Sequence, residues 1–226
     1  MHVFIQVRMS SKRLPGKVMM KVNNLRILDY LVDRLKYSNK YNIIITTSTN
    51  IEDDIIEKYC VDKKILYYRG NLNNVAKRII EAAKKFECRS FVRVSGDSPL
   101  LDVDIIDRAR NYYEKDKFDL VTNIFPRSYP TGQSVEIIRT SSLIKAYNKM
   151  YSLKHFEHVT PFFYENENLF KIKNFNYDKD LSTKKFTVDT KDDLNNFIKI
   201  LQRMKQNHTR YSMEDLLIIL DEIEAI

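Results

Sequence analysis

Val3-Phe-Ile-Gln-Val7 and the loop that follows it, Arg8-Met-Ser-Ser-Lys-Arg-Leu-Pro-Gly-Lys17, form the most informative stretch of this chain. The first five residues predict a buried strand, because four of them are apolar. The loop carries four cations, two hydroxyl groups and a glycine. Phosphate recognition needs cations and backbone N–H groups that can approach oxygen, so the loop is a candidate polyphosphate site. It matches neither the Walker A pattern nor GxGxxG, and a solvated basic loop is the alternative.

The same order of elements recurs through the first half of the chain. Further strands are expected at residues 43–47, 65–68 and 91–95. Segments with helical periodicity follow the four strands, at residues 28–35, 51–59, 73–86 and 103–114. This alternation predicts an α/β fold with a mainly parallel central sheet flanked by helices.

The alternation changes from about Asp119 onward. Two strands at 120–122 and 134–138 flank a loop with Pro and Gly, and a late short strand is expected at Lys185–Asp189. Helices are expected at residues 140–151, 156–164, 192–204 and 213–223, the last with Ser212 as its N-cap. No linker rich in Gly, Ser or Pro interrupts the chain. We therefore expect one domain over residues 1–226, with a nucleotide-binding half (1–118) and an acceptor-binding and dimerisation half (119–226).

Composition excludes several functional classes. The 226 residues are 43% hydrophobic, which is enough for a packed core, and their apolar runs are too short to span a membrane. The formal charge is +8, but the lysines are mixed with acidic residues, so we expect no nucleic-acid partner. Cys60 and Cys88 stand apart from any metal-binding pattern. The N-terminal residues lack the charge order of a signal peptide, and we expect a cytoplasmic protein.

The first loop closely resembles the Arg-x-x-Ser-x-Arg-Leu-Pro-Gly-Lys signature of cytidylyltransferases that activate acidic sugars, such as the CMP-ketodeoxyoctonate and CMP-acylneuraminate synthetases. The SpsF-like branch, named for a spore-coat polysaccharide protein, is the closer match. Further blocks resemble that branch in the same order along the chain: Tyr68–Val75 with Arg78, Arg93–Asp102, Tyr129–Glu136, Glu157–Pro161 and Thr187–Leu194. So many ordered matches are hard to explain by chance.

This resemblance implies a Rossmann-like nucleotide-diphosphosugar-transferase fold. It also implies a magnesium-dependent enzyme that transfers CMP from CTP to a small acidic acceptor and releases pyrophosphate, in surface polysaccharide biosynthesis. The acceptor would be an acidic sugar or a small phosphorylated or phosphonate metabolite. Related enzymes are commonly homodimers, and the helical region Thr140–Glu165 is the expected contact.

The resemblance also implies the nucleotide-binding residues. Arg13 and Lys17 would contact the phosphates and act as catalytic residues together with Asp97. The remaining residues expected around the nucleotide are Arg8, Ser10, Ser11, Arg69, Asn71, Arg78 and Ser95.

Two aspartates are candidate magnesium ligands. Asp97 and Asp189 each follow a short apolar strand, so their carboxylates are expected at the edge of the sheet where ligands bind. Magnesium prefers carboxylate oxygens combined with phosphate oxygens and water. The alternative for Asp189 is a helix N-cap, and the resemblance favours a metal role for both.

A different class of enzyme is kept as the alternative. Asp102-Val-Asp104 formally spells the DxD metal motif of a glycosyltransferase that uses a nucleotide-sugar. Both aspartates are better explained as residues at the start of a helix.

The acceptor site is expected in the second half of the chain. The candidate residues are Arg127, Gln133, Glu136 and His158. Arg127 offers a planar fork suited to carboxylate or phosphate, and Gln133 can both donate and accept. A solvated loop is the alternative for Arg127, and a structural hydrogen bond within its helix is the alternative for His158.

Overall fold

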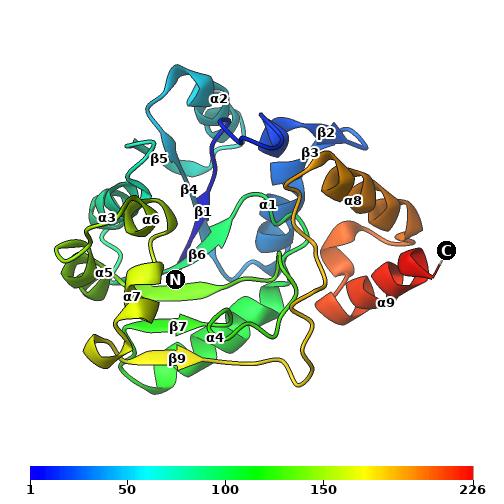
Figure 1. Ribbon diagram of the computed structural model, residues 1–226. Coiled ribbons are helices and arrows are strands. Elements are labelled where there is room, and N and C mark those ends of the chain that lie inside the picture. Colours follow the sequence, from blue (N-terminus) through cyan, green and yellow to red (C-terminus); the bar gives the residue numbers. More distant parts are fainter. Residues whose placement is uncertain (226) are drawn as a thin grey trace.

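A seven-stranded sheet forms the centre of the computed structural model, which describes residues 1–225 (Figure 1). Its strands lie in the order β5 (Leu66–Gly70), β4 (Asn42–Ser48), β1 (His2–Gln6), β6 (Ser90–Ser95), β8 (Glu136–Arg139), β7 (Leu120–Thr122) and β9 (Ile172–Asn174). The pairs β5–β4, β4–β1, β1–β6 and β7–β9 are parallel, whereas β8 runs antiparallel to both β6 and β7. The predicted α/β fold with a mainly parallel sheet is confirmed.

Helices cover both faces of this sheet (Figure 1). One face packs against α1 (Ile27–Ser38), α2 (Asp54–Asp62) and α4 (Val103–Lys115). The opposite face packs against α3 (Val75–Lys85), α5 (Thr140–Tyr147), α6 (Leu153–His158) and α7 (Pro161–Glu165). Strand β1 serves both cores, because Val3 and Ile5 point to the first face and Phe4 to the second.

The last two helices pack together beside α1 rather than on the sheet. α8 (Lys191–Arg203) and α9 (Met213–Glu224) share a third apolar cluster with Leu100, Phe186 and Val188. Thr190 caps α8 and Ser212 caps α9, each accepting a hydrogen bond from the backbone N–H three residues later. The predicted N-cap at Ser212 is confirmed.

Some predicted elements differ from the structure. Lys185–Asp189 is extended but is no strand, since only Lys185 forms an isolated bridge, with Thr131. The helix expected at 156–164 is split into α6 and α7, because Val159 has a φ of 73° and ends α6. Strand β9 and the antiparallel pair β2 (Lys21–Val22) and β3 (Leu25–Arg26) were not expected from the sequence.

Four short 3₁₀ helices complete the secondary structure of residues 1–225. These are η1 (Lys17–Met19), η2 (Ile51–Asp53), η3 (Glu167–Leu169) and η4 (His208–Arg210). No helix within the same residues is long and apolar enough to cross a membrane.

Candidate active site

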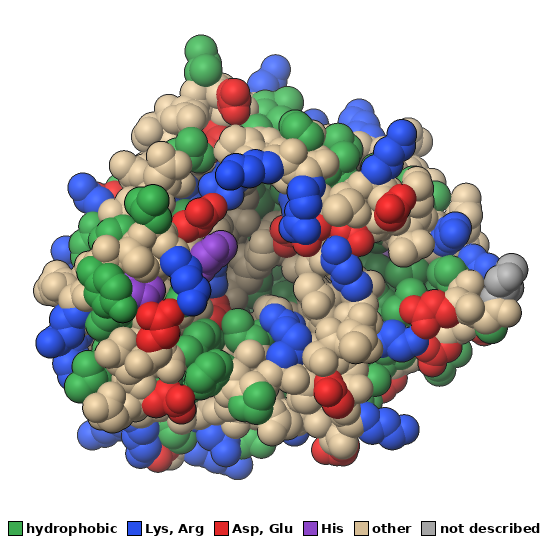
Figure 2. Space-filling model, in the orientation of Figure 1, with side chains coloured by type: hydrophobic (Ala, Val, Ile, Leu, Met, Phe, Trp, Pro, Cys, Tyr) green, Lys and Arg blue, Asp and Glu red, His purple; other side chains and the backbone are tan. Residues whose placement is uncertain are grey.

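A cavity of about 390 Å³ opens where β1 and β6 end. Open α/β sheets bind ligands at the carboxyl ends of their strands, so this is the expected position. Figure 2 shows the hollow in the middle of one face of the molecule, with Lys and Arg side chains at its rim. The lining residues include Gln6, Arg8, Ser11, Lys12, Arg13, Lys17, Ser95, Asp97, Glu157, His158 and Asp189.

Lys17 lies between the two predicted metal ligands. Its side chain is 8% exposed, and its Nζ lies 2.7 Å from Asp97 Oδ2 and 2.6 Å from Asp189 Oδ1. Gly16 makes this placement by turning the backbone just before η1 with a φ of 71°, a region that glycine adopts at little cost. The structure thus brings together three residues from three separate parts of the sequence.

The backbone fixes the two aspartates relative to each other. The N–H of Val188 donates to the carbonyl oxygen of Asp97 at 2.9 Å, and the N–H of Asp189 donates to Asp193 Oδ2 at 2.9 Å. Burial by itself would raise the pKa of Asp189, but hydrogen bonding to the Lys17 ammonium and the nearby charge of Arg13 lower it overall. Asp189 is therefore held as a carboxylate.

The carboxylate pair fits a divalent cation. Both oxygens already converge on one positive charge, the Lys17 ammonium, and Arg13 Nη2 lies 3.3 Å from Asp189 Oδ2. Among residues 1–225, no group of three or more His, Cys, Asp or Glu side chains is gathered into a metal site. A metal held by Asp97 and Asp189 would complete its coordination with phosphate oxygens and water, as magnesium commonly does.

An ion pair crosses the cavity at Arg8. Its Nη2 lies 2.8 Å from Glu157 Oε1 in α6, 149 residues later in the sequence. The hydrogen bond from Arg8 lowers the pKa of Glu157. Ser11 and the exposed Arg13 line the cavity beside this pair, whereas Ser10 is absent from its wall.

Comparison with known proteins identifies the family. The family model described as cytidylyltransferase matches residues 2–226. The chain belongs to the cytidylyltransferase family. It is 37% identical to an uncharacterised protein of Methanocaldococcus jannaschii over 74% of this chain and 68% of the relative. It is 27% identical to the spore coat polysaccharide biosynthesis protein SpsF of Bacillus subtilis over 96% of this chain and 92% of the relative.

A solved structure agrees with this assignment. A cytidylyltransferase from Leptospira borgpetersenii superposes with a TM-score of 0.93 at 27% identity, covering 99% of this chain and 94% of that one. The protein is therefore an enzyme that transfers CMP, a nucleotidyltransferase with the fold expected from its first loop.

Two residues predicted to bind the nucleotide, Arg69 and Asn71, are bonded to protein groups in this structure. Arg69 Nε donates to Ser48 O at 2.8 Å, and the rest of its guanidinium binds Asn50 O, Asp54 and Glu57. Asn71 Oδ1 accepts the backbone N–H groups of the two residues that precede α3, at 2.9 and 2.7 Å. Neither residue lines the cavity, because these contacts hold both side chains at the end of β5.

Arg78 is a different case, since part of its guanidinium has no hydrogen-bond partner. The side chain is fully buried, and Nη1 donates to Asn71 O at 3.0 Å. Its Nε and Nη2 have no partner within residues 1–225. Burial lowers the pKa of Arg78 to about 10, with Asp53 opposing and Arg8 adding to the shift. Arg78 does not line the cavity, so its predicted role in nucleotide binding stays a prediction.

Two residues predicted to bind the acceptor are engaged elsewhere. Gln133 is fully buried, and its side chain accepts from Asp102 N at 2.8 Å and donates to Leu100 O at 2.9 Å. Glu136 is also buried, with one oxygen paired to Arg93 and the other accepting from the Tyr164 hydroxyl at 2.7 Å. Neither residue lines the cavity, and the polar atoms of both side chains are bonded to protein groups, so their predicted acceptor role stays a prediction.

The other two acceptor candidates remain accessible. His158 lines the cavity next to Glu157. Arg127 is partly buried, and its Nη1 donates to Ser134 Oγ at 3.1 Å. Burial lowers the pKa of Arg127, while the charge of Glu136 opposes this shift. Arg127 is not among the residues that line the cavity.

Three polar residues of the cavity wall had no role predicted from the sequence: Gln6, Lys12 and Glu157. Glu157 is the first residue of Glu157–Pro161, one of the segments that resemble the family. Its carboxylate was the one feature that could have suggested a role in the site. Gln6 is identified by strand geometry, because it ends β1 on the same face as Arg93, to which it is hydrogen-bonded at 2.9 and 3.1 Å.

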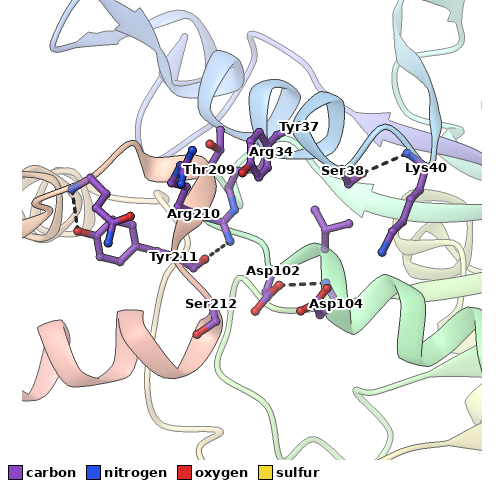
Figure 3. Close-up of a pocket in the computed structure, with 12 residues that line it drawn as sticks. Arg34, Tyr37, Ser38, Lys40, Asp102, Asp104, Thr209, Arg210, Tyr211 and Ser212 are labelled. Atoms are coloured by element: carbon purple, nitrogen blue, oxygen red, sulfur yellow. Dashed lines mark hydrogen bonds between the residues drawn. The ribbon is translucent and has the colours of Figure 1, made fainter.

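A second hollow of about 460 Å³ lies between the end of α1, the start of α4 and the segment before α9 (Figure 3). Its buried polar groups are occupied internally. Arg34 donates to the carbonyl oxygens of Leu101 and Tyr211 at 2.8 and 2.6 Å, and to that of His208. Asp102 accepts from the N–H groups of two helix starts. This hollow is built as a structural junction and lacks the unpaired groups of a binding site.

Proposed function

We propose that this cytidylyltransferase transfers CMP from CTP to a small acidic acceptor, with magnesium held by Asp97 and Asp189 and with release of pyrophosphate. One observation carries the proposal: two carboxylates from distant segments converge on the Lys17 ammonium beside a cavity rich in cations. Such a site provides ligands for a metal and neutralising charges for a triphosphate.

Positioning and charge neutralisation explain how the residues act. An oxygen of the acceptor attacks the α-phosphorus of CTP, the bond to the bridging oxygen breaks, and pyrophosphate leaves. Arg8, Arg13 and Lys17 neutralise the charge that builds on the departing phosphates. Ser11 and Ser95 are placed to orient the nucleotide. Asp97 and Asp189 would hold the magnesium ion, which would supply Lewis-acid catalysis and further positive charge at the phosphates.

The acceptor is an anion, and Arg127 and His158 contact it. Arg127 carries the planar fork that matches carboxylate or phosphate, and it has one hydrogen bond to a neutral hydroxyl. The cavity contains no His/Asp pair arranged as a strong general base among the described residues that line it. An acceptor that is already ionised at the attacking oxygen requires none.

The DxD alternative loses its structural basis. Asp102 caps α4, with Oδ1 accepting from Asp104 N at 3.0 Å and Oδ2 accepting from Met213 N at 2.6 Å. Both carboxylate oxygens thus bind backbone N–H groups, and the side chain is buried, away from the cavity at the ends of β1 and β6.

A screen for pyrophosphate release tests the proposal. The protein is incubated with each of the four NTPs against a panel of acidic sugars and phosphorylated or phosphonate metabolites. We expect release with CTP, a divalent metal and an anionic acceptor, and no release in EDTA. Activity with a nucleotide-sugar and no pyrophosphate would refute the reaction type. Activity that persists without divalent metal would refute the metal role.

We also propose that the protein forms a homodimer through the region Thr140–Glu165. We further propose that it acts in the cytoplasm, in surface polysaccharide biosynthesis. Tyr151 and Leu153 lie close together in this region and are 79% and 82% exposed, so they offer apolar surface for a subunit contact. The name of the Bacillus subtilis relative supports the pathway. Sedimentation velocity measures the oligomeric state directly.

A further inference from the structure

The turn at Thr131–Gln133 contacts the segment that carries Asp189. The N–H of Thr131 donates to Lys184 O at 2.9 Å, and the carbonyl oxygen of Thr131 accepts from Phe186 N at 2.7 Å. This is the isolated parallel bridge that replaces the strand expected in this region. The turn therefore fixes the backbone three residues before Asp189.

The same turn is bonded to the segment that follows Asp97. Gln133 accepts from Asp102 N at 2.8 Å and donates to Leu100 O at 2.9 Å, in the loop between Asp97 and α4. Its side chain is fully buried, so these bonds are shielded from water. One short turn thus binds both segments that present the carboxylate pair.

Gly132 allows the close approach between the turn and the Asp189 segment. Its φ is 98°, a region that other residues adopt only under strain. A Cβ at this position would lie 2.8 Å from the carbonyl carbon of Phe186 and 2.9 Å from the nitrogen of Thr187. Both are backbone atoms, so side-chain rotation cannot relieve the clash. Any larger residue must push the backbone of residues 186–187 away.

We propose that Gly132 is a positioning residue that sets the separation of Asp97 and Asp189. The turn is hydrogen-bonded to both segments and so holds them at a fixed distance. The hydrogen bond from Val188 N to Asp97 O, at 2.9 Å, joins the two segments directly. The inference rests on the metal site of the proposed function. It assigns the Tyr-Pro-Thr-Gly-Gln segment to the geometry of the carboxylate pair, instead of to contact with the acceptor.

Mn²⁺ binding to the nucleotide-free protein tests this inference. The affinity is measured by electron paramagnetic resonance for the wild type, Gly132→Ala and Gln133→Met. We expect a loss of about tenfold or more in Gly132→Ala, the range found when outer groups that orient metal ligands are altered. Gln133→Met removes the connection to the Asp97 segment without adding a clash, and it should weaken Mn²⁺ binding in the same way.

Ala146→Gly in α5 serves as the matched control. It alters a fully buried alanine on the opposite face of the sheet and lowers helix propensity, so it destabilises the fold at a distance from the aspartates. Its Mn²⁺ affinity should equal that of the wild type. Thermal unfolding of all variants separates loss of stability from loss of geometry, and Gln133→Met carries the test if Gly132→Ala does not fold.

Unchanged Mn²⁺ affinity in a folded Gly132→Ala or Gln133→Met protein would overturn the inference, and so would a wild type that binds no Mn²⁺. Failure of the proposed function gives a different result. In that case the pyrophosphate screen is negative with every NTP, while the differences in Mn²⁺ affinity among the variants persist.

Discussion

Replacing Lys17 by methionine should strengthen metal binding while it weakens catalysis. The Lys17 ammonium lies 2.7 Å from Asp97 and 2.6 Å from Asp189, where a divalent cation would share the same two oxygens. A metal that enters must therefore displace the ammonium. Methionine keeps most of the volume of the side chain but removes this competing charge.

The size of the effect follows from the contacts that are lost. Unit charges 2.7 Å apart attract by about 6 kcal/mol at an effective dielectric constant of about 20, but desolvation cancels most of this. The net value of a hydrogen bond to a charged group is about 1.5–3 kcal/mol. If the metal no longer has to replace one such bond, its affinity should rise by about tenfold or more.

Mn²⁺ titration of the nucleotide-free protein measures this rise, and pyrophosphate release measures turnover. Turnover of Lys17→Met should fall by about a hundredfold or more, because a cation that stabilises the departing phosphates is gone. Lys185→Met is the control: its ammonium lies 3.8 Å from Asp189 but is held by Asp193 at 2.7 Å, so Mn²⁺ affinity should change little. Weaker or unchanged Mn²⁺ binding in Lys17→Met would refute the competition.

Three further predictions follow from the site and the fold. Asp97→Asn should abolish magnesium-dependent pyrophosphate release and Asp189→Asn should at least raise the magnesium concentration required; full activity of either at low magnesium would contradict the assignment. Arg127→Ala should raise the acceptor KM or lower kcat while the KM for CTP stays nearly constant, and an equal loss for CTP would refute the division between the two substrates. Burial, with a smaller effect of Arg34, lowers the pKa of His208 to about 4 from 6.5, so the unfolded chain binds more protons between these values. Stability should therefore fall by about 3 kcal/mol as the pH drops from 7 to 4, and urea denaturation should show a smaller fall in His208→Gln.

The parts of the fold with strong local patterns could be predicted from the sequence. Leu28, Leu31 and Leu35 have helical spacing and are fully buried in α1, and the apolar runs of the first half are strands. Lys185–Asp189 has the apolar pattern of a strand, but its partners are single loop residues, so no ladder forms. A run of three residues such as β9 has too little periodicity to be distinguished from a loop.

The candidate site likewise has features that the sequence predicts and features that it does not. The meeting of the first loop with Asp97 could be predicted, because β1 and β6 end at the same edge of the sheet. Asp189 was expected there at the end of a strand that does not form, and its segment is instead held by the hydrogen bond from Val188 N to Asp97 O. The burial of Gln133 and Glu136 could not, since it depends on partners such as Leu100, Arg93 and Tyr164 that the sequence does not place beside them. A motif match alone does not show which of its polar residues face the ligand and which hold the loop in shape. The tertiary contacts are needed to tell them apart.

The ion pair between Lys17 and Asp189 also has a consequence for the order in which the protein folds. Its two members are 172 residues apart, and Arg8 and Glu157 are 149 apart. During synthesis the first strand and its basic loop leave the ribosome long before either acidic partner exists. Until then Asp97 can neutralise Lys17, but Arg8 and Arg13 still lack their acidic partners and can attract any polyphosphate in their surroundings. Closure of contacts this distant in sequence is slow, so the catalytic pocket is expected among the last parts of the molecule to form.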